Sequence, residues 1–176
     1  MKKLTLLVIS ILLTSVVTAG CGWHLRNNDT VQIMGNIGQV HLDGDQNSQL
    51  YRSVAKALKS SNVIITEIPR EAEIIIRLTN QSSTSRTASV SSSARVSELE
   101  ARESVDIMIL TGDGNVLLKT TTISKEKVFK YNEDNVSTND EEHDMLTREM
   151  VKDLSSTIIR RLNATLRQTE KNEHKG

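Results

Sequence analysis

The sequence predicts an α+β fold: a two-layer sandwich with a mixed, largely antiparallel sheet of about four to five strands and two helices packed on one face. Three observations predict it. Strand-like, helical and again strand-like patterns follow one another in the first half, a strand–turn–strand pattern surrounds Gly112–Asn115, and the last third has helical periodicity. The 176 residues include 37% hydrophobic residues and one proline, which fits a single domain behind a targeting segment.

Residues 1–20 are typical of a secretory signal. Lys2 and Lys3 precede an apolar stretch over residues 4–13, and the small residues Ala19 and Gly20 close the segment. The apolar stretch is shorter than the ~20 residues that a membrane-spanning helix needs. We therefore expect the segment to be removed.

The only cysteine follows the signal directly. The run from Thr18 to Gly22 resembles a bacterial lipobox, although Thr18 stands where an aliphatic residue is usual. We predict that Cys21 carries an S-diacylglycerol and an N-acyl group, which together hold a protein permanently on a membrane. The alternative is a free or buried thiol. Residues 21–30 are interpreted as a leash, and Gly22 in place of Asp resembles lipoproteins sorted to the outer membrane.

The single domain is predicted over residues 31–167, and its first half alternates strand and helix. Partly alternating apolar residues predict a strand over 31–42, which ends at the turn Asp43–Asp45. Helical spacing predicts a helix over 48–60, with Asn47 or Ser48 as its cap. A short strand over 63–68 then ends at Pro69, which cannot donate to a sheet ladder.

The middle of the chain contains one segment with two interpretations. Three consecutive isoleucines within residues 73–79 predict a central, buried strand. Residues 81–93 are mostly Ser and Thr, which suits either a disordered linker or an extended hairpin arm. We favour the arm, because no Gly or Pro interrupts the segment.

A hairpin and a helix complete the domain. The strand over 96–110 turns at Gly112–Asn115 into a strand over 116–127, since this turn offers residues that accept positive φ. A helix is predicted over 138–167, with a capping box that starts at Thr138 and the acidic run Asp140–Asp144 near its positive end. Residues 168–176 are predicted to be a disordered polar tail.

The composition excludes several classes of function. The 22 basic and 22 acidic residues balance, which argues against a protein that neutralises the phosphates of nucleic acid. A single cysteine excludes an internal disulfide and a Cys-rich metal site. No histidine pair has metal-ligand spacing, and no nucleophile or phosphate-loop motif occurs, so we expect no cofactor, no metal and no catalytic residue. The histidines are His24, His41, His143 and His174.

Two stretches carry a family resemblance. The first is the run of residues 21–26, Cys-Gly-Trp-His-Leu-Arg, and the second is the run of residues 140–150 that opens the last helix. With the order of elements, they resemble the LptE family of outer-membrane lipoproteins. The resemblance implies a non-enzymatic plug and assembly factor that lies in the lumen of a large β-barrel, LptD, and forms with it the translocon for lipopolysaccharide (LPS). It also implies LPS as a ligand.

Candidate LPS-binding residues follow from the chemistry of lipid A. Its phosphates call for Arg or Lys in charge-assisted hydrogen bonds. Arg86 and Arg95 flank the predicted tip of the arm, and we select them as candidates. Four lysines line the facing strand and are further cations near the arm: Lys119, Lys125, Lys127 and Lys130. The alternative is that all of these are ordinary solvated charges.

Two other functions compete with this interpretation. One is an adaptor lipoprotein of another envelope machine, such as the complex that inserts β-barrels. The other is an envelope hydrolase that uses carboxylates such as Glu103 and Asp106. The absence of a paired catalytic motif and the scarcity of aromatic residues argue against the hydrolase.

Overall fold

The fold is built around a five-stranded mixed sheet. The computed structural model describes residues 37–92, 95–132 and 134–173. In chain order the elements are β1 (Gln39–Asp43), α3 (Gln49–Ser60), β2 (Ile64–Ile65), the 3₁₀ turn η2 (Pro69–Glu71), β3 (Ile74–Val90), β4 (Val96–Thr111), β5 (Val116–Lys130) and α4 (Val136–Glu173). The strand order is β2-β1-β3-β4-β5. The predicted α+β class is confirmed.

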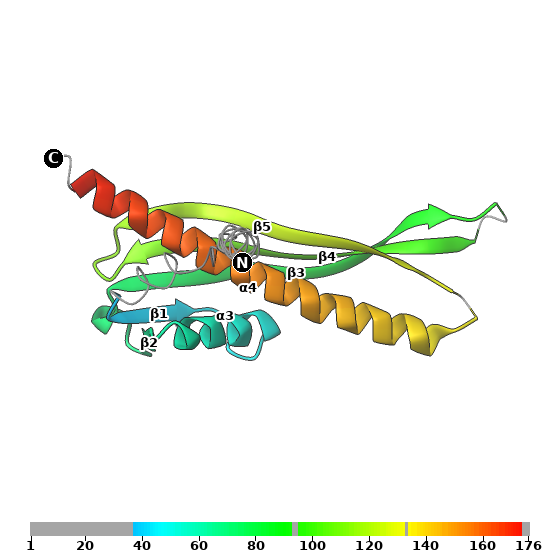
Figure 1. The fold of residues 1–176 in the computed structure, drawn as a ribbon, viewed down its shortest axis with the longest axis horizontal. Helices are drawn as coiled ribbons and strands as arrows, with labels where there is room; N and C mark the ends of the chain where they lie inside the picture. Colours follow the sequence, from blue (N-terminus) through cyan, green and yellow to red (C-terminus); the bar gives the residue numbers. More distant parts are fainter. Residues whose placement is uncertain (1–36, 93–94, 133, 174–176) are drawn as a thin grey trace, which may run out of the picture.

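Strand directions divide the sheet in two. β1 is parallel to both β2 and β3, whereas β3, β4 and β5 are successively antiparallel. β1 reaches only the start of β3, over Ile74–Arg77. The three long strands therefore continue past the two short ones (Figure 1).

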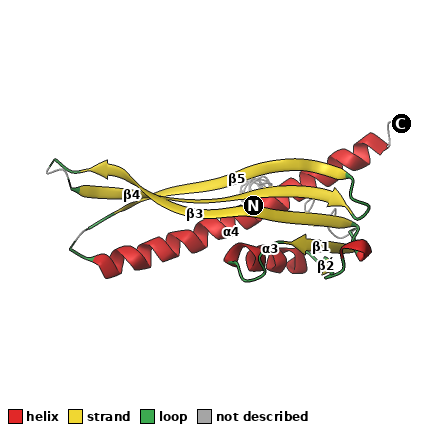
Figure 2. Cartoon of the chain, turned by 180° about the vertical axis from the view of Figure 1, so that it is seen from behind, coloured by secondary structure: helices red, strands yellow, loops and turns green. Residues whose placement is uncertain are grey.

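Both helices pack on the same face of the sheet. α4 runs obliquely along that face, and the view from behind shows the long strands in front of it (Figure 2). Buried side chains of α3, of α4 and of alternate positions on β1, β3 and β4 form one hydrophobic core. Its fully buried members include Val40, Leu50, Val54, Leu58, Ile76, Val105, Ile107, Ile109, Ile158 and Leu162.

The first helix agrees with its prediction. Ser48 caps α3, because its hydroxyl accepts a hydrogen bond of 3.0 Å from the Tyr51 N–H. Leu50, Val54 and Leu58 recur every fourth residue and are completely buried. The helix ends where Asn62 takes a φ of 60°.

The first two strands are shorter than predicted. β1 begins at Gln39, and residues 31–36 of the predicted strand lie outside the described residues. β2 contains only Ile64 and Ile65. The Thr66 N–H still donates to the Val40 carbonyl, but the chain then turns, because the Thr66 hydroxyl accepts a hydrogen bond from the Ile68 N–H. The predicted strand over 63–68 is wrong beyond these two residues.

The Ser/Thr-rich segment forms the hairpin arm and not a linker. β3 is continuous from Ile74 to Val90 and pairs with β4 as far as Val96. The second predicted hairpin, β4–β5, is also present. In its turn only Gly114 has a positive φ, of 87°. Gly112 is needed for a different reason: a Cβ there would collide with the Ala72 carbonyl oxygen, because the Gly112 N–H donates to the neighbouring Glu73 carbonyl.

The last helix is longer at both ends than predicted. α4 begins at Val136, so Thr138 lies inside it and the predicted capping box is wrong. The reason is that the Asn139 N–H already donates to the Asn135 carbonyl, while the Asn139 side chain bonds the backbone of Asn132. At the other end, residues 168–173 are helical and not a disordered tail, and Gln168, Thr169 and Asn172 line a hollow together with Val116 and Leu117 of β5. The last three residues of the predicted tail, 174–176, lie outside the described residues.

Candidate functional site at the end of the arm

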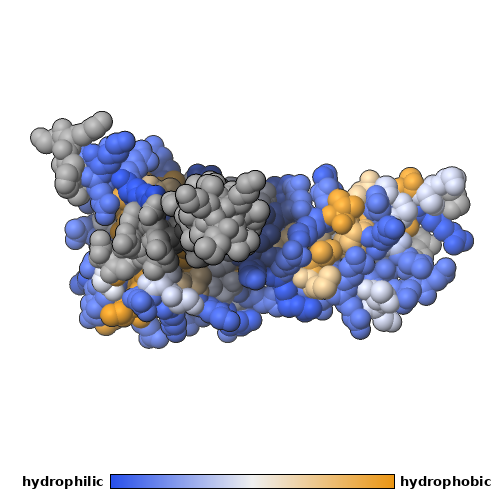
Figure 3. Space-filling view, viewed as in Figure 1, coloured by the Kyte–Doolittle hydropathy of each residue, from blue (hydrophilic) through white to orange (hydrophobic). Residues whose placement is uncertain are grey.

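The arm is the part of the sheet that extends past the core. We define it as Gln81–Val90 of β3, Val96–Ser104 of β4 and Ser124–Lys130 of β5. The first half of α4 lies along it (Figure 1). On the face seen in Figure 3, hydrophobic surface gathers at this end among hydrophilic residues. The arm therefore combines a polar strand with a small apolar area.

A β-bulge marks the base of the arm. The register between β3 and β4 shifts between Thr79 and Ser82, and Asn80 takes a φ of 50°. The Asn80 amide donates to one oxygen of Asp106 at 2.8 Å, and the Thr122 hydroxyl donates to the other at 2.5 Å. These two hydrogen bonds lower the pKa of Asp106. The bond from Thr122 has the larger effect and the bond from Asn80 the smaller one. Asp106 thus joins β3, β4 and β5 as an ionised acceptor.

The two acids considered for a hydrolase do not meet. Glu103 is buried on the face of β4 that α4 covers, and its carboxylate accepts from the Ser83 hydroxyl. Asp106, three residues further, lies on the opposite face. Two carboxylates on opposite sides of a sheet cannot act on one bond, so they form no acid–base pair.

Glu103 is unusual for an arm residue because its side chain is only 3% exposed. Burial raises its pKa, while the Ser83 hydrogen bond and the charge of His143 act in the opposite direction. Lys125 of β5 lies opposite Glu103 in the sheet register. The acid sits between Val105 of the main core and Ala101 of a second apolar cluster.

That second cluster lies under the arm. Ala101, Phe129 and Met150 are its buried members, and the half-buried Leu99 and Leu146 pack against it. It holds the first half of α4 against β4 and β5. Outside this cluster the arm also exposes Val90 and Val128, which are 61% and 55% exposed.

Beside the cluster is a shallow hollow of about 190 Å³ that contains three rings. Phe129 and His143 face each other with centroids 5.7 Å apart and planes tilted by 47°. Tyr131, two residues after Phe129, also lines the hollow. The remaining lining residues are Ser85, Leu99, Asn139 and Asp140. Rings beside a hydroxyl and a carboxylate suit the alternating apolar and hydroxyl-bearing faces of a sugar.

This hollow was not predicted from the sequence. The chain has only four aromatic residues, but the fold brings two of them together with a histidine. The available signal was the spacing of Phe129 and Tyr131, which places both rings on one face of a strand. His143 could not be added from the sequence, because its position depends on how α4 packs.

The two arginine candidates do not lie side by side. Arg86 is paired with Glu100, at 2.8 and 3.1 Å, and this pairing raises the pKa of Arg86 and lowers that of Glu100. Arg95 is exposed at the tip. There the Ser91 N–H donates a hydrogen bond of 2.7 Å to the Arg95 carbonyl. Arg86 lies farther down the arm, opposite Glu100. Both residues are exposed, and the charge of Arg86 is shared with Glu100.

The lysines of β5 also do not form one surface. Successive strand residues point to opposite faces, so Lys125 and Lys127 face α4 while Lys130 faces away. Lys127 forms an ion pair of 2.7 Å with Glu149 of α4. Arg102 of β4 is likewise paired, with Glu126 at 3.2 Å.

Two kinds of feature are absent from the described ranges. No group of three or more His, Cys, Asp or Glu side chains there could hold a metal ion. No helix in those ranges is both long and apolar enough to cross a membrane. Cys21, the predicted lipidation site, lies outside the described residues.

Relatives share this domain. Two proteins described as LPS-assembly lipoprotein LptE are similar: one from Photorhabdus laumondii is 27% identical over 160 residues, which are 90% of this chain and 85% of the relative. The other, from Pectobacterium atrosepticum, is 29% identical over 157 residues, 85% of this chain and 80% of the relative.

Solved structures share the fold. Rare lipoprotein B from Shewanella oneidensis has a TM-score of 0.68 at 20% identity, covering 76% of this chain and 99% of its own. A lipoprotein B from Nitrosomonas europaea has a TM-score of 0.66 at 19% identity, covering 73% of this chain and 83% of its own. The family model for lipopolysaccharide assembly, LptE, matches residues 37–162. Since that match spans both layers of the sheet–helix sandwich and the whole arm, the chain belongs to the LptE family of lipopolysaccharide assembly.

Proposed function

We propose that this protein is an outer-membrane lipoprotein that forms the LPS translocon together with a large LptD-like β-barrel. In this role it fills the lumen of the barrel, assists its assembly and contacts LPS, and it acts by binding without enzymatic turnover. Membership of the LptE family is the observation that carries the proposal.

The arm supports a location inside a barrel. The lumen of a large outer-membrane barrel is polar, so a protein that fills it needs a polar, hydrogen-bonding surface. All residues from Asn80 to Ala88 are exposed, and most of them carry hydroxyl or amide groups. The near balance of charge also suits a protein that a partner encloses.

The experiment that tests the partnership is purification of the full-length protein from its native outer membrane in mild detergent. Recovery with one large β-barrel protein at equal stoichiometry is expected. Recovery with the components of another envelope complex would favour the adaptor function and contradict the proposal.

For LPS we propose contacts with Arg86, Arg95 and the ring-lined hollow. The two arginines would bind phosphates, and Tyr131 would stack on a sugar. A hydrogen bond to a charged group is worth about 1.5–3 kcal/mol, so replacing Arg86 and Arg95 together by Ala should weaken LPS binding at least ~10-fold. The Arg160→Ala, Arg161→Ala variant removes two exposed cations elsewhere and serves as the control. Equal affinities of the two double variants in a binding assay would exclude the arginines.

We further propose that Cys21 is the membrane anchor. Several dozen buried methylene groups at ~0.8 kcal/mol each make such an anchor effectively irreversible. Cys21→Ser should therefore move the protein to the soluble fraction when cells lacking the barrel partner are fractionated, while its circular dichroism stays unchanged. A variant that stays in the membrane fraction without the partner would contradict this role.

A further inference from the structure

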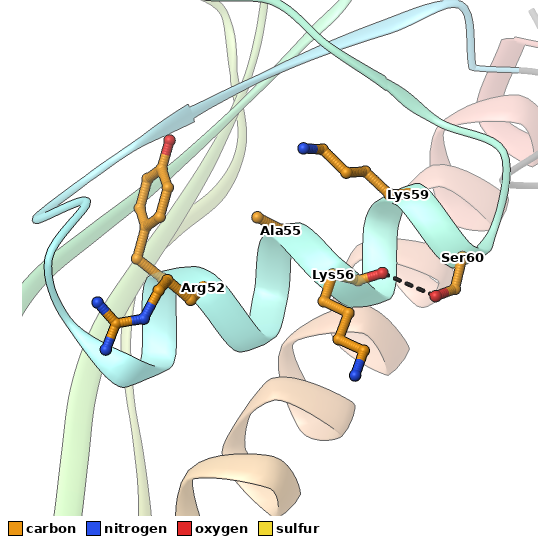
Figure 4. Close-up of a pocket in the computed structure, with 6 residues that line it drawn as sticks. Arg52, Ala55, Lys56, Lys59 and Ser60 are labelled. Atoms are coloured by element: carbon orange, nitrogen blue, oxygen red, sulfur yellow. Dashed lines mark hydrogen bonds between the residues drawn. The ribbon is translucent and has the colours of Figure 1, made fainter.

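We propose that the outer flank of α3 is a docking surface for anionic phospholipid headgroups. We call this surface the α3 stripe and define it as Arg52, Lys56 and Lys59. With Tyr51, Ala55 and Ser60 these residues line a shallow hollow of about 550 Å³ (Figure 4). The stripe lies in the half of the molecule opposite the arm tip, so it is separate from the proposed LPS contacts (Figure 1).

The stripe forms no ion pair among the described residues. α3 itself contains no acidic residue, and the four ion pairs of the described ranges use Arg77, Arg86, Arg102 and Lys127 instead. No acid lines the hollow of the stripe, and Glu67 lines the adjoining hollow beside Lys59. Arg52 donates to a backbone carbonyl, that of Asn47, at 2.7 Å. The arm and the sheet thus balance several of their cations in ion pairs, whereas three cations of the stripe face one nearby acid.

This arrangement is unfavourable for the isolated helix. Arg52 and Lys56 are four residues apart and Lys56 and Lys59 three, so like charges are neighbours on the helix surface. Arg52 also stands near the positive end of the helix dipole, where an acid would be stabilising. An external anionic surface removes both penalties, because it supplies the missing counter-charge.

The geometry favours a surface over a single anion. In Figure 4 the three cationic side chains point in different directions from the helix and do not converge on one point. A lone phosphate could meet only one of these side chains as they lie in Figure 4, whereas a surface of many headgroups offers a separate partner to each. Each basic residue near an anionic leaflet contributes about 1 kcal/mol of attraction.

The position of the stripe in the chain also fits a membrane. Lys59 lines a second hollow with Ile65 and Thr66, and Ile64 pairs with Gln39 near the first described residues. This part of the inference rests on the proposed anchor at Cys21: the residues between Cys21 and Ile37 span at most about 55 Å when fully extended. The stripe is therefore within reach of the leaflet that would hold the acyl chains.

The test uses the mature chain, residues 21–176, with Cys21→Ser, so that neither acyl groups nor the apolar signal segment masks weak adsorption. The protein is sedimented with vesicles of phosphatidylglycerol or of phosphatidylcholine, at low and high NaCl. We expect binding to phosphatidylglycerol alone, and its loss at high salt. A second chain that also carries Arg52→Gln, Lys56→Gln and Lys59→Gln should partition about 100-fold less, since ~1 kcal/mol per residue corresponds to about fivefold for each.

A matched control carries Lys152→Gln, Arg160→Gln and Arg161→Gln, which remove the same charge from exposed positions of α4. The control should bind nearly as well as the parent. No binding of the parent to phosphatidylglycerol, or equal losses in the two triple variants, would overturn the inference. The assay contains no barrel partner and no LPS, so its failure would leave the proposed function standing, and copurification tests that function separately.

Discussion

At the scale of single residues, Glu103 makes the stability of this protein depend on pH. Its pKa is raised in the folded state by burial. The folded protein therefore holds this proton at pH values where the unfolded chain has already released it. By linkage, stability falls as pH rises from the ordinary range of a glutamate, near 4.5, through the raised folded value.

We predict that Glu103→Gln removes this fall and stabilises the protein at neutral pH by on the order of 1 kcal/mol, because the amide needs no charge to be buried. The other groups facing this site are Ser83 of β3, Lys125 of β5 and His143 of α4. Urea unfolding of both proteins between pH 4 and 7 measures the difference.

Glu100→Gln is the matched control on the opposite face of β4. The Arg86 hydrogen bond lowers the pKa of Glu100. Its contribution to stability is therefore present at neutral pH and is lost as pH falls through the lowered value, the opposite sign to Glu103. Parallel pH profiles for Glu103→Gln and the parent would refute the role assigned to the buried acid.

At the scale of elements, the bulge at Asn80 is the joint between core and arm. We predict that Asn80→Ala destabilises the protein by about 1–2 kcal/mol, because alanine tolerates the left-handed backbone poorly and leaves one oxygen of Asp106 without its donor. Asn80→Gly should recover the backbone part only. Urea unfolding of the three proteins separates the two contributions, and a Gly variant less stable than the Ala variant would show that backbone strain is not involved.

The elements also show what the sequence could predict. α3 was predictable because Ser48 supplies a cap and Leu50, Val54 and Leu58 share one helical face. The arm could be predicted only as the favoured of two alternatives. Ser and Thr tolerate an extended backbone, and no Gly or Pro interrupts the segment. The start of α4 was not, because Thr138 offers a plausible cap in sequence while the Asn139 amide is bound to Asn132 in space. Local patterns predict elements, and contacts between elements decide their ends.

The candidate site depended even more on contacts that a sequence does not show. The sequence indicates cations on the arm, but it cannot show that Glu100 neutralises Arg86 across two strands. Nor can it show that His143 approaches Phe129, because that contact depends on how α4 crosses β5. Cys21 is the contrary case: its prediction depends on neighbouring residues alone.

At the scale of the whole molecule, α4 connects two apolar clusters of unequal size. At 1.5 Å per residue its 38 residues span about 57 Å. From Val151 onward α4 contributes Val151, Leu154, Ile158 and Leu162 to the large core, whereas the part before Val151 packs on the small cluster, in which Met150 joins Ala101 and Phe129. Glu103 lies between the clusters. The arm should therefore open on its own at a lower free energy than the core.

We predict that Phe129→Ala loosens the arm while the core stays folded. A buried phenylalanine replaced by alanine typically costs 3–5 kcal/mol, which exceeds what so small a cluster can lose without opening. Hydrogen exchange should then accelerate in β5 beyond Ser124 and in the first turns of α4, while amides of β3 near Ile76 and of α4 near Ile158 keep their protection. Leu154→Ala is the control, because Leu154 is 1% exposed in the large core and its loss should accelerate exchange everywhere. A uniform effect of Phe129→Ala would mean that arm and core unfold as one unit, in which case a partner could not rearrange the arm without unfolding the domain.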